Sequence, residues 1–173
     1  MTGPGFSNAY RSTWSLQPRI AYYFSEEWGF EVFYSKVFNS ENNTYKALSS
    51  TGTTLFPVIH EIRSEMGALL HWVPWYAKIN VFNSILYFDW YFAGGLGSVM
   101  DAMTTSKTDV NSFSTSNDLA LYLGTGHQYH INETFTVRLD FMGTYYRAPL
   151  TVSSPDKVWF SNYDFTFGLG IRL

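Results

Sequence analysis

Apolar and polar residues alternate one for one in seven separate stretches of this chain. In one of them, for example, Phe135 and Val137 alternate with Thr136 and Arg138. Successive side chains of a β-strand point to opposite faces of the sheet, so a period of two predicts strands with one apolar and one polar face. The seven expected strands comprise residues 14–24, 28–35, 61–72, 86–93, 119–126, 135–142 and 159–173.

The expected strands are long, and their connections alternate in length. A soluble strand has about 5 or 6 residues, whereas a tilted strand that crosses a bilayer needs about 9 to 11. The stretches here are nearer to the second length. Short turns on one side and long loops on the other are typical of bacterial outer-membrane barrels. We expect tight turns at 25–27 and 131–133, an intermediate connection at Pro74 and Trp75, and long polar loops at 39–57, 100–116 and 148–157.

Composition favours a membrane barrel over a soluble β-sandwich, a lipocalin-like barrel or a fibre protein. Aromatic residues make up 20% of the chain and charged residues only 14%, against about 25% charged residues in ordinary soluble domains. The period of two does not tell which face points inward, but a soluble barrel would carry many charges on its outer face. Tryptophan gathers at membrane interfaces. Five tryptophans lie at or near the ends of expected strands: Trp14, Trp28, Trp72, Trp75 and Trp159.

Several classes of protein are excluded by the sequence. No stretch approaches the roughly 20 apolar residues of a membrane-spanning helix. The net charge of −3 argues against a general nucleic-acid binder. Cysteine is absent, which excludes disulfides, thiolate metal sites and a cysteine nucleophile. Residues 1–5 have neither the basic start nor the apolar core of a signal peptide, so we expect a cytosolic protein or a mature or fragmentary piece of an exported one.

An odd number of expected strands leaves the barrel incomplete. Bacterial single-chain barrels have an even number of strands, and an open sheet edge is not tolerated in lipid. Residues 1–11 are too short and glycine-rich for both a crossing and a loop. We therefore expect a single domain, residues 1–173, that lacks its first strand. That strand would come from sequence upstream of Met1 or from another chain, and would lie between strands 14–24 and 159–173, antiparallel to both.

Residues 74–83 read PWYAKINVFN, residues 87–91 YFDWY and residues 94–97 GGLG. These segments resemble a family of small outer-membrane β-barrel domain proteins that is typical of predatory and gliding Gram-negative bacteria. Ala77 stands where the family usually has glycine. The resemblance extends over most of the chain from about Phe6. It implies an integral outer-membrane barrel of about eight strands, with a strand before Phe6 and no characterised activity. Further similar segments are 22–24 and 137–140.

Ten charged residues fall on the polar face of the expected strands, which would be the barrel interior. A narrow barrel of eight strands holds side chains and little water, and an unpaired buried ion is costly. We therefore expect a closed interior filled by ion pairs, with a gated ion or proton path through the same groups as the alternative. Glycines on this face would leave room for long arginines. The ten residues are Arg19, Glu31, Glu61, Arg63, Glu65, Asp89, Arg138, Asp140, Asp164 and Arg172.

Two cations fall on the apolar face, near the long-loop ends of their strands. They are Lys36 and Arg147. A charge on the lipid face costs little near the membrane interface. Their side chains are therefore expected either to contact lipopolysaccharide phosphates or to extend to the rim.

Catalytic and cofactor motifs are absent from the sequence. His127 and His130 are three residues apart on a strand and would point to opposite faces, so they cannot share a metal, and we expect the histidines at the membrane interface. No Gly-x-Ser-x-Gly elbow exists, and Ser98 has no histidine at a matching depth. The Gly95-x-Gly97 pair is not followed by a helix, so no dinucleotide site is expected. We expect no enzyme, no metal and no cofactor.

The sequence predicts an all-β, antiparallel, up-and-down transmembrane barrel of about eight strands in the bacterial outer membrane. Its expected role is structural, anchoring or surface-binding, without catalysis, and the long loops would carry recognition. The alternatives are a narrow channel, a lipid-modifying outer-membrane enzyme and a subunit of a larger envelope complex. The expected partners are outer-membrane lipid, lipopolysaccharide and other envelope proteins, and no nucleic acid.

Overall fold

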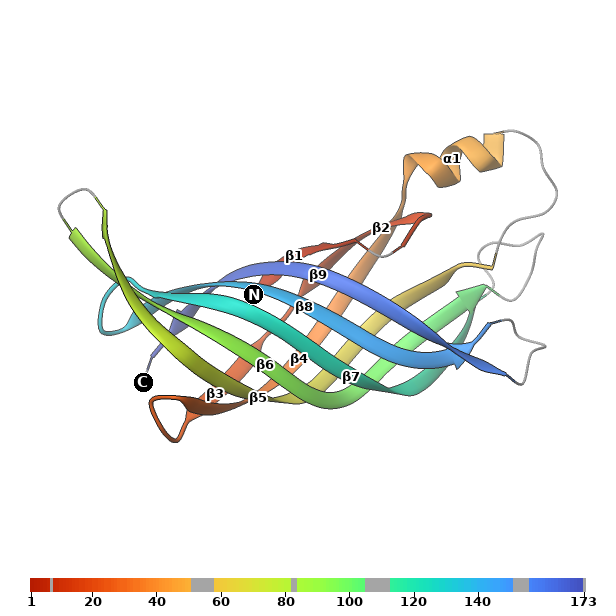
Figure 1. The fold of residues 1–173 in the computed structure, drawn as a ribbon. Coiled ribbons are helices and arrows are strands. Elements are labelled where there is room, and N and C mark those ends of the chain that lie inside the picture. The colour runs from red at the N-terminus through yellow and green to blue at the C-terminus, as the bar shows by residue number, and fades with distance from the viewer. Residues whose placement is uncertain (7, 51–57, 82–83, 105–112, 151–155, 173) are drawn as a thin grey trace.

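The computed structural model describes residues 1–6, 8–50, 58–81, 84–104, 113–150 and 156–172. The described chain forms a twisted antiparallel sheet that curls into a barrel, with one short helix at one end (Figure 1). No helix in this part of the chain is long and apolar enough to cross a membrane. The elements are β1 (Thr2–Gly5), β2 (Arg11–Leu16), β3 (Arg19–Tyr23), β4 (Trp28–Glu41), α1 (Asn43–Ser50), β5 (His60–Val81), β6 (Ser84–Thr104), β7 (Phe113–His130), β8 (Phe135–Pro149) and β9 (Lys157–Ile171).

The sheet closes into a ring with eight strand positions. β3 to β9 pair in sequence order, each antiparallel to the next. β2 and β3 both pair with β4, so they form one strand position that is interrupted at Gln17 and Pro18. Proline has no N–H to donate to the ladder, which explains the interruption. β1 joins β2 to β9 and completes the ring.

The closing strand corrects our expectation about its origin. It lies between β2 and β9 and is antiparallel to both, as predicted, with Thr2 opposite Leu16 on one side and Phe167 on the other. It is formed by Thr2–Gly5 of this chain, however, and not by residues before Met1. A strand of four residues needs far less chain than a full crossing. It closes the middle of the gap between its two neighbours.

Five strands, β4 to β8, run further than the alternation predicts, and β5, β6 and β7 do so most. β5, β6 and β7 have 22, 21 and 18 residues, and part of the loop expected at 100–116 is strand. The connection expected at Pro74 and Trp75 is wrong, because both residues lie within β5. The register shifts there, with Trp72 opposite Phe92 and Trp75 opposite Trp90. Such a bulge accommodates a proline without breaking the strand, and the β5–β6 hairpin extends beyond the barrel (Figure 1).

The longer connections gather at one end of the barrel. α1 lies at this end, where β6 and β8 end and β7 and β9 begin (Figure 1). Asn42 caps the helix, since its side-chain oxygen accepts a hydrogen bond from the Tyr45 N–H at 2.9 Å. The turns between β3 and β4 and between β7 and β8 lie at the opposite end. Most of the loops expected at 39–57 and 148–157 lies outside the described residues or in α1.

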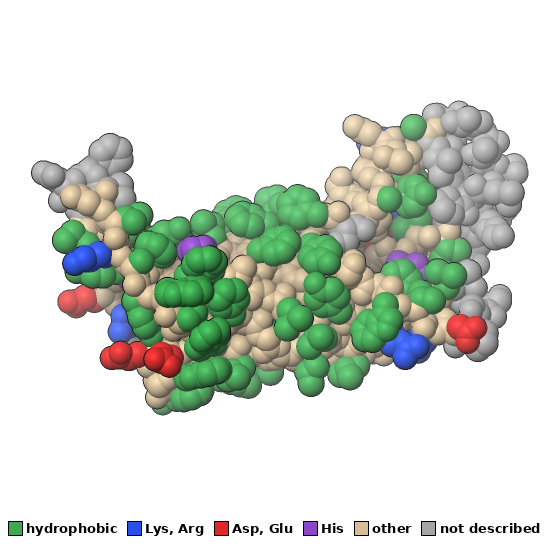
Figure 2. Space-filling model, in the orientation of Figure 1, with side chains coloured by type: hydrophobic (Ala, Val, Ile, Leu, Met, Phe, Trp, Pro, Cys, Tyr) green, Lys and Arg blue, Asp and Glu red, His purple; other side chains and the backbone are tan. Residues whose placement is uncertain are grey.

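The apolar face of the strands points outward. Large side chains such as Leu70, Trp72 and Phe167 are exposed on the barrel wall. Figure 2 shows apolar side chains over its middle, with charged side chains toward the ends. Neighbouring rings form contacts on this wall, including Trp75 and Trp90 with centroids 5.0 Å apart. An apolar wall with aromatic clusters is typical of a barrel that is surrounded by lipid.

Candidate functional site

Four charged side chains meet in the middle of the barrel interior. Arg19 of β3 lies 3.0 Å from Glu31 of β4 and 2.8 Å from Asp140 of β8. Arg138 of β8 lies 2.5 Å from the second oxygen of Glu31 and 3.0 Å from Asp140. The two carboxylates are 0% and 1% exposed. Two cations and two anions therefore form a neutral, buried ring of ion pairs, which we call the central ion cluster.

Aromatic side chains extend the central ion cluster across the lumen. The Tyr91 hydroxyl donates to Asp140 and accepts a hydrogen bond from Arg138 at 2.6 Å. The His71 ring stacks on Tyr91 with centroids 4.7 Å apart, and its Nδ1 lies 3.2 Å from the Tyr23 hydroxyl. His71 was expected at the membrane interface and lies instead in the interior. It follows the same period of two as Leu69, which is also buried.

Gly126 gives this cluster its space. A Cβ atom at this position would collide with the Tyr91 hydroxyl and an Asp140 carboxylate oxygen. We expect Gly126→Val to lower the free energy of unfolding by about 1 to 3 kcal/mol, the usual cost of overpacking a core, as measured by urea unfolding in lipid vesicles. Gly94→Val is the matched control, because a Cβ there would meet only Leu123 at an ordinary 3.5 Å. Equal stability of the two variants would contradict the close packing around Tyr91.

A second polar layer lies beside the central ion cluster and lacks a cation of its own. Gln17 donates to Asp164 at 3.2 Å and accepts a hydrogen bond from Arg19. Glu65 lies beside the same small cavity as Asp164, and its Oε1 is buried without a hydrogen-bond partner. Among the described residues no ion pair includes Glu65 or Asp164. Both lie in the interior as predicted, but the expectation that every interior charge is paired is wrong here, since both nearby arginines bind the central carboxylates.

At the long-loop end of the barrel, Glu61 is the centre of another group. It contacts Arg63, and the Nε of Arg11 lies 3.3 Å away. Arg63 is at a register shift in β5 and its side chain is 41% exposed, so it lies at the rim. Arg11 was not predicted, because it precedes the alternating part of its strand.

At the opposite end, Asp89 is paired with a histidine. The Nε2 of His130 lies 2.7 Å from the carboxylate, and both side chains are about one-fifth exposed. Arg172 was expected inside the barrel but is exposed just after the end of β9. None of the ion pairs among the described residues includes it. The alternation in the sequence continues past Ile171, where β9 ends.

Two further pairs were missed because the sequence placed one residue of each, Asp101 and Lys157, in an expected loop. Asp101 lies 2.8 Å from the Nδ1 of His60, and Asp118 lies 2.5 Å from the Nζ of Lys157. Asp101 lies on the same face as Val99, which is fully buried. The signal was thus present in the period of two, which continues into the segment expected to be a loop.

The two histidines expected on opposite faces are found there. His127 stacks on Trp90 on the outer wall, with centroids 5.3 Å apart, whereas His130 contacts Asp89. Within the described ranges no group of three or more histidine, aspartate or glutamate residues could hold a metal ion.

The two predicted lipid-facing cations are both exposed on the wall. Lys36 of β4 lies opposite Leu16 and Ser64. Arg147 of β8 lies opposite Trp159, with its guanidinium 5.8 Å from the centre of the indole ring. Neither takes part in an ion pair with the described carboxylates, so both are available to an anion from outside.

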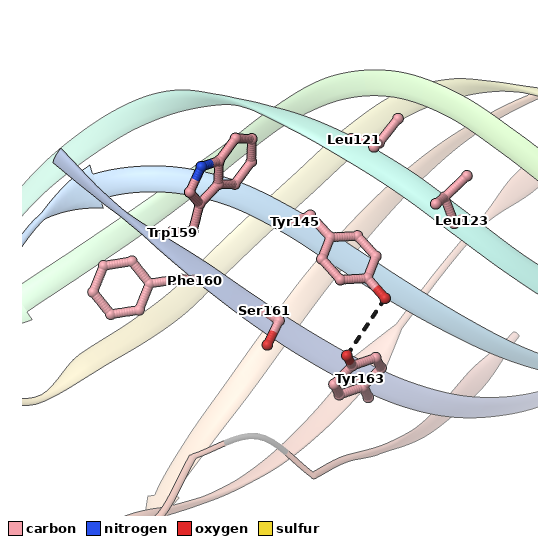
Figure 3. Close-up of a pocket in the computed structure, with 7 residues that line it drawn as sticks. All are labelled: Leu121, Leu123, Tyr145, Trp159, Phe160, Ser161 and Tyr163. Atoms are coloured by element: carbon pink, nitrogen blue, oxygen red, sulfur yellow. Dashed lines mark hydrogen bonds between the residues drawn. The ribbon is translucent and has the colours of Figure 1, made fainter.

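A hollow of about 460 Å³ opens on the outer wall close to Arg147. Figure 3 shows its residues projecting from three adjacent strands. The Tyr145 and Tyr163 hydroxyls lie 3.4 Å apart on one side, and Phe160, which is half-buried, contributes to the lining. The residues of the outer face that line it are Leu121, Leu123, Tyr145, Trp159, Ser161 and Tyr163.

Comparison with known proteins gives one match. The family model described as outer membrane protein beta-barrel domain matches residues 3–172, almost the whole chain. No curated protein matches. No solved structure matches either.

Proposed function

The chain belongs to the outer membrane protein β-barrel domain family and so is a protein of the bacterial outer membrane, and from this we propose that it acts there without catalysis as a structural, anchoring or surface-binding protein. Its lumen is closed, and its partners meet it at the outer wall and at the loop end. The lipid and lipopolysaccharide of the membrane are the first of these partners. Other envelope proteins are the second. From the segments around residues 74–97 we infer a source among predatory or gliding bacteria.

The central ion cluster carries this proposal. Arg19 and Arg138 each bind both Glu31 and Asp140, and Tyr91 fills the space beside them. Moving an ion through this layer would require breaking buried ion pairs, which is strongly unfavourable at low dielectric. With two cations and two anions, the central ion cluster itself carries no net charge.

The loop end supports a binding role. α1 lies at this end, where β6 and β8 end and β7 and β9 begin (Figure 1). Loops on a rigid barrel are the usual carriers of recognition. Long loops of outer-membrane barrels lie on the extracellular side, so the partners would be at the cell surface.

Conductance measurements test the closed lumen. The purified protein in a planar bilayer is expected to show no stepwise current, because the central ion cluster spans the interior. The double variant Arg19→Ala with Asp140→Ala removes one cation and one anion and is expected to leak. Steady wild-type conductance would establish the narrow channel instead. Lipid mass spectrometry of the same bilayers tests catalysis, and a newly modified lipid would overturn the non-catalytic role.

A further inference from the structure

The hollow on the outer wall is a shaped depression in a surface that otherwise faces lipid. Leu121, Tyr145 and Ser161 lie side by side on β7, β8 and β9, since they are register partners. They all belong to the outward face, which is apolar elsewhere on these strands. A volume of about 460 Å³ lies within the roughly 300 to 1,000 Å³ of common ligand sites.

Two sequence features create the depression. Ser161 is small and stands between the larger Trp159 and Tyr163, so it leaves a gap in the row of aromatic side chains on β9 (Figure 3). The Tyr145 ring lies over Gly143, where a Cβ atom would be only 3.0 Å from the ring. The ring therefore leans toward Tyr163, with their planes at 86°. The floor beside Ser161 stays open as a result.

A cation lies next to the hollow. Arg147 is exposed, its guanidinium lies near the face of Trp159, and Trp159 lines the hollow. One of its nitrogen atoms donates to the Lys157 carbonyl oxygen at 3.0 Å. Arg147 precedes the β8–β9 connection, which is at the loop end of the barrel (Figure 1), so it faces the outer leaflet. A guanidinium there binds phosphate oxygens well.

We propose that the hollow between β7, β8 and β9 binds one acyl chain of the phosphorylated glycolipid of the outer leaflet, lipid A, with its phosphate on Arg147. The occupant is a lipid because the site opens on the lipid-facing wall. The occupant is anionic because Arg147, the cation beside the hollow, forms no ion pair with a described carboxylate. Lys36 is also exposed on this wall, but the hollow is not lined by its strand. This inference extends the lipopolysaccharide contact of the proposed function to one site.

Native mass spectrometry of the detergent-solubilised protein with added lipid A tests the site. The wild-type protein is expected to retain one lipid A molecule. Ser161→Trp fills the hollow, and Arg147→Gln removes the cation. Each variant is expected to weaken retention roughly tenfold or more, the effect of losing one good charged or apolar contact.

Matched controls separate the site from general effects of the substitutions. Ser64→Trp places the same ring on the outward face of β5, between Lys36 of β4 and Met100 of β6, and none of these strands lines the hollow. Lys36→Gln removes the other exposed cation. Both are expected to retain lipid A as the wild type does. Heat-modifiable migration on gels shows that each variant is folded.

Phosphatidylcholine tests whether the site requires an anionic headgroup. Phosphatidylglycerol tests whether the site distinguishes lipid A from other anionic lipids. Weaker retention of both than of lipid A supports the site. Equal retention of phosphatidylglycerol would overturn the choice of lipid A, and unchanged retention by Ser161→Trp would overturn the site. Neither result affects the closed lumen, which the conductance measurement tests separately.

Discussion

Replacing Arg138 by methionine is expected to lower the free energy of unfolding by about 3 to 5 kcal/mol, the usual cost of removing one partner of a buried ion pair. The change leaves Glu31 and Asp140 sharing only Arg19, and both carboxylates are buried. The Tyr91 hydroxyl also loses a donor at 2.6 Å. Urea unfolding in lipid vesicles, followed by tryptophan fluorescence, measures the loss.

Two further variants make this result specific. The double variant Arg138→Met with Glu31→Gln removes one charge of each sign and is expected to recover much of the stability. Arg172→Met is the matched control, because Arg172 is exposed, and it is expected to stay within about 0.5 kcal/mol of the wild type. An unchanged unfolding midpoint for Arg138→Met would show that the central ion cluster does not stabilise the barrel.

Deletion of residues 1–5 is expected to abolish the folded barrel. β1 supplies the only strand between β2 and β9 in the described chain, and without it both edges would be exposed to lipid. Each unsatisfied backbone group in the bilayer costs several kcal/mol. The truncated protein should therefore lose the heat-modifiable band on gels and become sensitive to protease.

A side-chain substitution in the same strand serves as the control. Thr2→Val removes the hydroxyl that donates to the Ser15 carbonyl oxygen at 2.7 Å and accepts from Trp14, but it keeps the backbone pairing. We expect it to cost only about 1 kcal/mol, the net worth of a typical hydrogen bond or two. A protease-resistant truncated barrel would mean that β2 and β9 pair directly, in parallel.

The sequence predicts most of the barrel wall because one rule, the alternation of apolar and polar residues, governs the strands. Alternation identified β4 to β9, and it also assigned the faces of Arg19, Arg138 and Asp140 correctly. The rule fails where tertiary contacts decide the structure. The segment TGPG of β1 has no alternation, and three of its four residues are glycine or proline, which are depleted in strands. It is held as a strand by the open edges on both sides. Pro74 suggested a connection, but a bulge keeps it within β5.

The sequence predicted which charged residues lie in the barrel interior, but not which of them pair with one another. A period of two places a charge on a face, whereas its partner depends on strand tilt and on side-chain length. Arg138 reaches Glu31, which is 107 residues away in sequence. Glu65 follows the same pattern, but its buried Oε1 has no hydrogen-bond partner and it forms no ion pair with the described residues. His71 and Arg11 were overlooked because the first was assigned to the interface and the second lies outside the alternating stretch.

The pairing of β1 with β9 also constrains how the protein is made. Synthesis produces β1 first and β9 last, and the barrel cannot close until both are present. The neighbouring strands form local hairpins, whereas this contact joins the first and the last of the described strands and carries the largest loop-closure entropy. The chain from β1 to β9 must therefore cross the periplasm with its apolar wall unformed, and its insertion into the membrane ends with the pairing of β1, the first of the described strands to be made.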